Sequence, residues 1–255
     1  MKGATTTVAA THHRSEAGSN GADWHRCGLA DGGAAIGSLI RELRPRAVVN
    51  TAYVRDGDDL WPVTALAPGE MAAACREVGA RFVHLSTDVV FDGTTDRPYV
   101  EGDVPGPVHD YGRAKAEAER RVAAADPGGV IARTSLLWGG RDDPGPQVMM
   151  TTNPDITFFT DEYRNPLEVS LLSDACLELA ARTDIGGVLH VAGADTVDRL
   201  EFARRVAPLA AVDPRTLRGA PAPIDTSRPR NCPLDSSRAR SLLHSSLRGV
   251  REATS

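Results

Sequence analysis

The sequence predicts an α/β protein with a doubly wound parallel sheet and a small C-terminal lobe. Short apolar runs typical of buried strands occur at Ala47–Asn50, Arg81–Ser86 and Val130–Ala132, and segments with helical character separate them. Strands that alternate with helices pack as a parallel sheet with helices on both faces. We therefore expect these three strands to be neighbours in one sheet.

The N-terminal elements follow from local patterns. Thr6–Thr11 predicts a short strand and Asp23–Leu29 an edge strand, with a polar, glycine-rich loop between them. Ala34–Leu43 places its apolar residues on one face of a helix. A second helix is expected over Trp61–Val78, where Pro68 should disturb the backbone hydrogen bonding.

The second half is more mixed. A helix that begins near Tyr111 should end near Ala124, before Pro127. We divide the chain into residues 1–135, which hold most of the sheet, and residues 136–255, a lobe interleaved with the last strands. The other expected elements are strands over Ile156–Phe159 and Val188–Ala192, helices over Ser173–Ala181 and Arg199–Leu209, and an irregular tail over Pro221–Pro233.

Composition excludes several classes of function. The net charge of the 255 residues is -5 and no long basic block occurs, which argues against nucleic acid as a partner. The four cysteines have no metal or redox spacing, so we expect reduced thiols and no metal site. No apolar stretch is long enough for a membrane span, and the first residues do not resemble a signal peptide. We expect a soluble cytoplasmic protein.

Tyr111 and Lys115 form the most informative pair. Four residues apart, they lie on one helix face, where an ammonium can lower the pKa of a phenol. Such a phenol suits the interconversion of carbonyl and alcohol. Thr87 ends the strand Arg81–Ser86, at the sheet edge where ligands bind. We expect all three side chains to converge; the alternative is a surface tyrosine beside a solvated lysine.

The surrounding motifs resemble the dTDP-4-dehydrorhamnose reductases, extended short-chain dehydrogenase/reductases that make activated L-rhamnose. The resemblance covers most of the chain from about Ala47 onward. Its motifs are Val48–Tyr53, Ala65–Pro68, Val83–Gly93, Arg97–Glu101, Pro105–Pro107, Arg133–Ser135, Gly187–Gly193 and Arg228–Asn231.

The resemblance implies a Rossmann-like fold with a substrate lobe. It implies reduction, by NADPH, of the C4 ketone of a dTDP-linked 4-keto-6-deoxy sugar. In that reaction Tyr111 donates the proton, and Lys115 holds the nicotinamide ribose and depresses the tyrosine pKa. Thr87 hydrogen-bonds the substrate oxygen, and Asp88 lies beside it. The nucleotide sugar is the expected partner, and a homodimer is left open.

Further contacts are implied at the cofactor and the sugar. The resemblance assigns Ala52, Tyr53 and Val54 to the cofactor. Arg14 follows a strand where arginine accommodates a 2′-phosphate, which favours NADPH over NADH, although a solvated loop arginine is equally compatible. Trp138 stands two residues from the position where the family has a substrate-packing tryptophan. It either contacts substrate or belongs to the core, which leaves the sugar nucleotide undecided.

The strand, glycine-rich turn and helix that open a dinucleotide-binding sheet are missing from this sequence. The glycines of Asp31–Gly37 have the wrong spacing. We expect that the sequence lacks an N-terminal stretch present in a functional relative, that two sheet strands lose a neighbour, and that NADPH binds weakly or not at all. The rival interpretation is a non-catalytic nucleotide-sugar- or dinucleotide-binding protein resembling the regulatory subunit of methionine adenosyltransferase.

Overall fold

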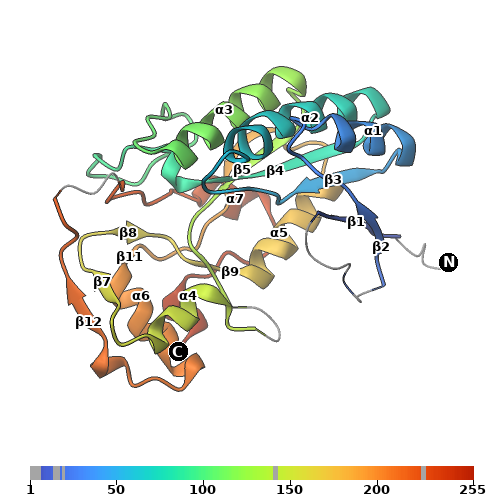
Figure 1. Ribbon diagram of the computed structural model, residues 1–255. Coiled ribbons are helices and arrows are strands. Elements are labelled where there is room, and N and C mark those ends of the chain that lie inside the picture. Colours follow the sequence, from blue (N-terminus) through green and yellow to red (C-terminus); the bar gives the residue numbers. More distant parts are fainter. Residues whose placement is uncertain (1–6, 14–17, 19–20, 140–142, 225–227) are drawn as a thin grey trace.

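The computed structural model describes residues 7–13, 18, 21–139, 143–224 and 228–255 (Figure 1). Its strands are β1 (Ala9–His12), β2 (Asp23–Arg26), β3 (Ala47–Asn50), β4 (Arg81–Thr87), β5 (Val130–Thr134), β6 (Leu137–Trp138), β7 (Thr157–Phe159), β8 (Tyr163–Arg164), β9 (Leu167–Glu168), β10 (Gly187–His190), β11 (Val197–Asp198) and β12 (Arg218–Ala220). Its α-helices are α1 (Ala34–Leu43), α2 (Ala67–Val78), α3 (Asp110–Ala125), α4 (Gly145–Met149), α5 (Val169–Ala181), α6 (Arg199–Val206), α7 (Ser237–Leu242) and α8 (Val250–Ala253).

Four parallel strands form the main sheet, in the order β10-β5-β4-β3. The prediction that Ala47–Asn50, Arg81–Ser86 and Val130–Ala132 are neighbours is therefore confirmed. In the register, Val83 lies opposite Val130 and Thr87 opposite Thr134. The carboxyl ends of β4 and β5 consequently lie side by side, at the edge where ligands bind in open α/β sheets.

Helices cover both faces of this sheet, as a doubly wound fold requires. Figure 1 shows α1, α2 and α3 on one face and α5 and α7 on the other. Alternate residues of β4 serve the two layers: Phe82 packs with the α1–α3 layer and Val83 with the α5–α7 layer. The same alternation turns His84 and Ser86 toward α3.

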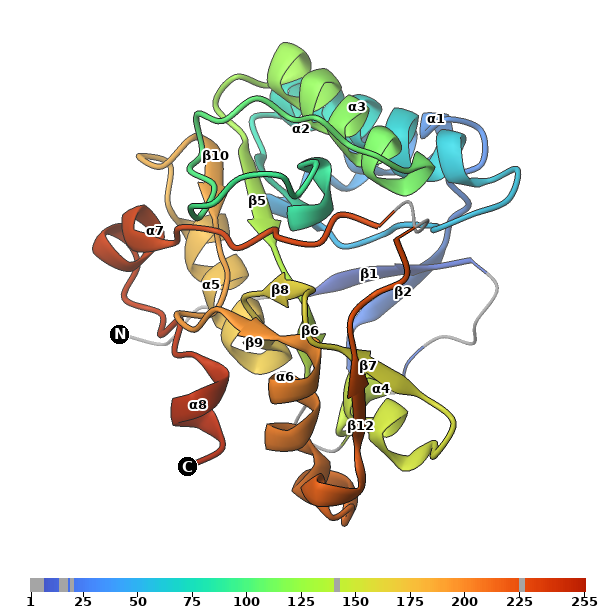
Figure 2. The same cartoon turned by 90° about the vertical axis from the view of Figure 1, so that its left-hand side faces the viewer.

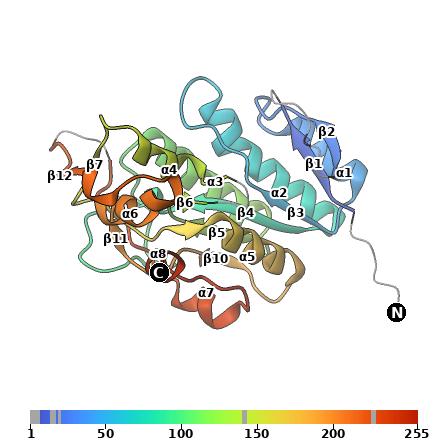
Figure 3. The same ribbon diagram turned by 90° about the horizontal axis from the view of Figure 1, so that it is seen from below.

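Strands β1 and β2 form a separate parallel pair. Among the described residues, β1 pairs only with β2 and β3 pairs only with β4. The pair lies at the β3 end of the molecule, next to α1 (Figure 3). The expectation that two strands would each lack a neighbour agrees with this arrangement.

The C-terminal lobe consists of short paired strands and helices (Figure 2). β6 pairs with β9, β7 with β12 and β8 with β11. Two apolar clusters fill the lobe, one around Trp138 and Phe202 and the other around Phe158 and Leu217. The residues after 135 also contribute β10, α5 and α7 to the main sheet layers. No helix within the described residues is long and apolar enough to cross a membrane.

Some element boundaries differ from the predicted ones. A π-helical segment over Leu60–Leu66 precedes α2, and Pro68 lies in the first turn of α2, where its missing N–H is tolerated. Helix α5 begins at Val169, four residues before the predicted start at Ser173, whose hydroxyl instead bonds the Val169 carbonyl. Helix α6 ends at Val206, before a 3₁₀ turn that contains Pro208.

Candidate active site

Helix α3 begins close to the end of β4. His109 is its N-cap residue, and the His109 Nδ1 atom accepts a hydrogen bond of 2.9 Å from the Gly112 N–H. Gly112 allows the helix to approach the sheet, because a Cβ at this position would overlap the Val89 carbonyl oxygen. The first turn of α3, which carries Tyr111, therefore packs closely against Val89, two residues after Thr87 in the chain.

Lys115 is buried on the inner face of α3. Its ammonium donates a 2.8 Å hydrogen bond to the Leu85 carbonyl and lies 5.9 Å from the centroid of the Tyr53 ring. Burial lowers the pKa of Lys115 to about 8, although the Glu119 carboxylate acts in the opposite direction. At neutral pH the lysine is still charged, as the proposed contact with a ribose requires.

Tyr111 is surrounded by two side chains from the segment after β3. Its ring lies 5.9 Å from the Tyr53 ring, and the Arg55 guanidinium lies 5.6 Å from its centroid. Burial raises the pKa of Tyr111, and the charge of Asp88 also raises it, while Arg55 lowers it. The expectation that Lys115 depresses this pKa is wrong for this structure, since desolvation of the phenolate outweighs the nearby cations.

Thr87 and Asp88 meet at the end of β4, as predicted. The Thr87 hydroxyl lies 3.3 Å from Asp88 Oδ1, and Ser135 donates a 2.5 Å hydrogen bond to Asp88 Oδ2. The Arg164 Nε atom lies 3.4 Å from the same carboxylate, which is 4% exposed. The charge of Asp88 acts on the pKa of Tyr111. The end of β4 and the face of α3 that carries Tyr111 therefore lie close together.

The segment Ala52–Val54 is held by buried polar groups rather than left free. Asn50 Oδ1 accepts a hydrogen bond from the Ala52 N–H. Thr64 Oγ1 accepts one from the Val54 N–H and donates one to the Val54 carbonyl, both at 2.8 Å. These bonds place Tyr53, whose ring is half exposed, beside Tyr111 and Lys115.

Trp138 and Arg230, which belongs to the motif Arg228–Asn231, have partners in the lobe. Trp138 is 5% exposed and packs in the lobe core, so the structure favours its structural role and the predicted substrate contact gains no support. Arg230 is bound by Asp161 at 2.6 Å. Arg14 lies outside the described residues.

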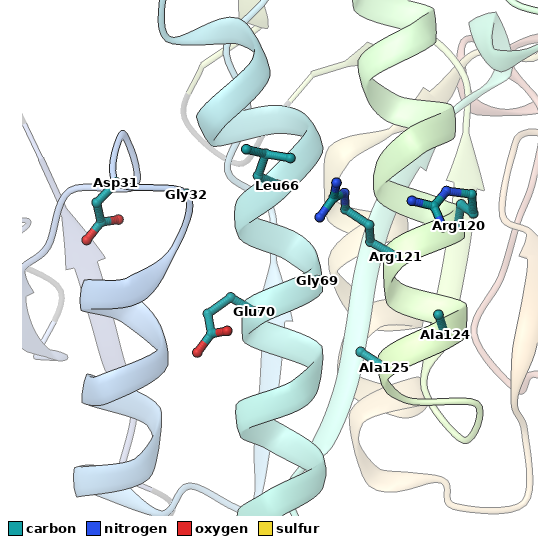
Figure 4. A pocket seen from close by; sticks show the side chains of 9 residues that line it. All are labelled: Asp31, Gly32, Leu66, Gly69, Glu70, Arg120, Arg121, Ala124 and Ala125. Carbon is teal, nitrogen blue, oxygen red and sulfur yellow. The ribbon is translucent and has the colours of Figure 1, made fainter.

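A cavity of about 660 Å³ opens between α1, α2 and α3, away from Tyr111 and Lys115 (Figure 4). It is lined by Asp31, Gly32, Leu66, Gly69, Glu70, Arg120, Arg121, Ala124 and Ala125. The Asp31 carboxylate accepts hydrogen bonds from the Gly33 and Ala35 N–H groups, at 3.0 and 2.8 Å. It thus occupies the helix N-terminus that would otherwise attract a phosphate, which agrees with the prediction that Asp31–Gly37 is an ordinary loop and helix start.

Sequence reasoning missed three charged residues at the site, one of which is Arg164, 3.4 Å from the Asp88 carboxylate. Arg55, next to the segment Ala52–Val54, lies over the Tyr111 ring. Glu119 lies one turn after Lys115 and acts on the lysine charge. For Glu119, the helical spacing of Tyr111, Lys115 and Glu119 was the available signal, because residues four apart share a helix face.

Comparison with known proteins places the chain in a family. The family model described as the RmlD substrate binding domain matches residues 5–255. The chain is 33% identical over 219 residues to the dTDP-4-dehydrorhamnose reductase of Mycobacterium tuberculosis, covering 80% of this chain and 71% of that protein. It is 32% identical over 215 residues to the probable low-salt glycan biosynthesis reductase Agl14 of Haloferax volcanii, covering 77% and 71%.

The match does not extend over the whole length of these relatives. The chain spans 64% and 61% of the dTDP-4-dehydrorhamnose reductases of Sinorhizobium fredii and Mycolicibacterium smegmatis. It is also 27% identical over 229 residues to methionine adenosyltransferase 2 subunit beta of Rattus norvegicus, covering 82% of this chain and 68% of that protein.

The fold has close counterparts among solved structures. A dTDP-4-dehydrorhamnose reductase from Bacillus anthracis, solved in complex with NADP, superposes with a TM-score of 0.78 at 20% identity, covering 98% of each chain. From the family model and the relatives above 30% identity, the chain belongs to the dTDP-4-dehydrorhamnose reductase family.

Proposed function

We propose that the protein reduces the C4 ketone of a dTDP-linked 4-keto-6-deoxy sugar with NADPH as the reductant. The observation that supports the proposal is the packing of α3, which carries Tyr111 and Lys115, on β4, where Lys115 bonds the Leu85 carbonyl two residues before Thr87. Relatives that share this family are named as reductases of dTDP-4-keto sugars. NADH is the alternative reductant.

Tyr111 is the proton donor in this proposal. Because burial raises its pKa, the phenol is protonated at neutral pH and can give its proton to the oxygen of the reduced ketone. Arg55, over the ring, stabilises the phenolate that remains. Thr87 is placed to hydrogen-bond the same substrate oxygen; its single O–H, which points to Asp88 in this structure, turns from that carboxylate to the substrate.

The residues present fit the nicotinamide end of the cofactor. An ammonium has three N–H donors, and one of those of Lys115 is used by the Leu85 carbonyl. The remaining donors suit the hydroxyls of a ribose, beside the half-exposed ring of Tyr53. When bound, NADPH supplies the hydride that carbon 4 of the sugar receives. On the protein side, Tyr111 carries the proton that is transferred and Lys115 carries the positive charge.

Two measurements test the proposal. The purified chain is mixed with NADPH and a dTDP-4-keto-6-deoxy sugar, and NADPH oxidation is compared with formation of the reduced sugar nucleotide. Calorimetric titration of NADPH alone measures cofactor affinity. We expect oxidation and sugar reduction in equal amounts, with cofactor binding weaker than micromolar, since the glycines of Asp31–Gly37 lack the spacing that cradles a pyrophosphate.

The rival, a non-catalytic binding protein, predicts a different pattern. It requires binding of NADPH or the sugar nucleotide without any reduction of the ketone. That outcome would contradict the reductase and favour a regulatory role of the kind named for the rat relative. Micromolar binding with turnover would support the reductase and refute the expected weak affinity. The cytoplasmic location stays a prediction.

A further inference from the structure

A buried carboxylate continues the row of Tyr111 and Lys115 along α3. Glu119 lies one turn after Lys115 and is 5% exposed. Its Oε1 atom accepts hydrogen bonds from Ser86 Oγ at 2.5 Å and from Arg133 Nε at 2.9 Å, and its Oε2 atom accepts one from Arg133 at 2.7 Å. The carboxylate therefore links α3 to both β4 and β5.

These bonds act on the same strand that Lys115 contacts. Lys115 bonds the carbonyl of Leu85, and Glu119 bonds the hydroxyl of the next residue, Ser86. Two polar side chains, one turn apart on α3, thus fix the helix along β4.

Lys115 has few charged neighbours. Tyr53 faces it from the segment after β3, His84 from β4, and Tyr111 and Glu119 from α3 itself. His84 is fully buried, and burial keeps its pKa well below its ordinary value, so it is neutral. Within the described residues, Glu119 is the one carboxylate whose charge acts on the lysine.

We propose that Glu119 is a positioning residue for Lys115, which supplies the counter-charge of the ammonium and fixes α3 against β4 through Ser86. The merely structural alternative is that Glu119 only neutralises Arg133. The two differ in whether the charge state of Lys115 depends on Glu119. The consequence for catalysis rests on the proposed function, but the titration of the lysine does not.

The composition of the chain makes this titration accessible. Lysine occurs at two positions, Lys2 and Lys115, against 27 arginines. Arginine holds its charge at every working pH, whereas a buried lysine titrates. With ¹⁵N-labelled lysine, the side-chain nitrogen therefore gives two signals, and that of Lys115 can be followed through pH.

The test compares Glu119→Gln with the wild type. Glutamine keeps the shape of the side chain but removes the charge. We expect the titration midpoint of Lys115, near 8 in the wild type, to fall by about 1 unit, because an opposite charge is lost nearby. The alkaline limb of kcat/KM for ketone reduction should move to lower pH by the same amount.

Glu117→Gln is the matched control. Glu117 lies on the same helix but pairs with Arg120 and Arg121 at the surface, so its loss should leave the midpoint of Lys115 unchanged. If the buried Arg133 prevents Glu119→Gln from folding, the double variant Glu119→Gln, Arg133→Gln removes the unpaired cation. The midpoint should fall less in the double variant, because Arg133, whose guanidinium lies 2.7 Å from Glu119, takes a positive charge away together with the carboxylate.

The outcomes separate the two proposals. An unchanged Lys115 midpoint in a folded Glu119 variant overturns the positioning role, whatever the activity. A lowered midpoint in a chain whose wild type reduces no sugar would support the role of Glu119 and refute the proposed reductase.

Discussion

Burial acts in opposite directions on Tyr111 and Lys115. It raises the pKa of the phenol and lowers that of the ammonium to about 8, because each neutral form is favoured away from water. The apo site therefore holds a protonated phenol beside a lysine that is charged at neutral pH. This arrangement suits proton donation to a developing alkoxide.

Tyr111→Phe should abolish most turnover while leaving the cofactor site intact. It removes the proton donor but keeps the ring between Tyr53 and Arg55. General acid catalysis contributes roughly 10²–10⁴-fold, so we expect kcat to fall by about that factor with little change in NADPH affinity. Steady-state kinetics and calorimetry measure the two quantities.

The control for this change is Tyr163→Phe, at an exposed ring of β8. It should leave kcat unchanged. A Tyr111→Phe enzyme that keeps a tenth or more of the wild-type kcat would show that another group delivers the proton.

The site residues differ in how far the sequence could predict them. Tyr111, Lys115, Thr87 and Asp88 were found because helical spacing and a strand end mark them. The raised pKa of Tyr111 was not predicted, since it depends on how completely other segments bury the phenol. For Trp138, the sequence left substrate contact and a place in the core open, and the structure packs it with residues of α6 and α8 in the lobe.

At the scale of elements, the contact between α3 and the end of β4 sets the geometry of the site. Gly112→Ala adds a methyl group against the Val89 carbonyl, so the first turn of α3 must shift. Overpacking of this kind costs about 1–3 kcal/mol. We expect a lower midpoint in urea unfolding and a reduced kcat, because Tyr111 moves with the helix.

Gly102→Ala is the matched control, since a Cβ at Gly102 meets open space. Its urea midpoint and its kcat should equal those of the wild type. If Gly112→Ala instead stabilises the protein, as alanine does in an unobstructed helix, the close contact with Val89 does not constrain α3.

Element types were easier to predict than their boundaries. Apolar runs and glycine or proline punctuation identified β3, β4, β5 and α3. The start of α5 was placed too late, at Ser173, although the preceding Leu172 is already a buried residue of the helix. The π-helical segment before α2 has no local pattern that would predict it.

At the scale of the whole molecule, the alternation of strands and helices predicted that β3, β4 and β5 share one sheet, but not the place of β10 next to β5. The register between β4 and β5, which sets Thr87 opposite Thr134, required the tertiary structure. The separation of β1 and β2 from this sheet agrees with the absence of an opening glycine-rich unit in the printed sequence. The paired short strands of the lobe were largely unpredicted, because two-residue strands carry no periodicity.

Two buried histidines and one half-buried histidine should make the whole protein acid-sensitive. Desolvation holds the pKa values of His84, His109 and His190 below the ordinary 6.5. As the pH falls below 6.5, the unfolded chain binds protons that the native state does not bind. The contribution of these histidines to the free energy of unfolding is therefore present above that pH and is lost as the pH falls. Carboxylates such as Asp103, with a pKa lowered to about 2, contribute to acid loss only at lower pH.

We expect the free energy of unfolding to fall between pH 6.5 and 5, by about 1.4 kcal/mol per pH unit for each proton taken up. The raised pKa of the buried Asp88 has the opposite sign, because there the native state binds the extra proton. Urea titrations at several pH values measure this slope.

His109→Asn separates one contribution, because an asparagine oxygen can still accept from the Gly112 N–H but does not titrate. Its slope should be shallower by up to one proton, whereas His244→Asn, at an exposed position, should keep the wild-type slope. A wild-type stability that is flat between pH 8 and 5 would mean that these imidazoles accept protons inside the folded protein.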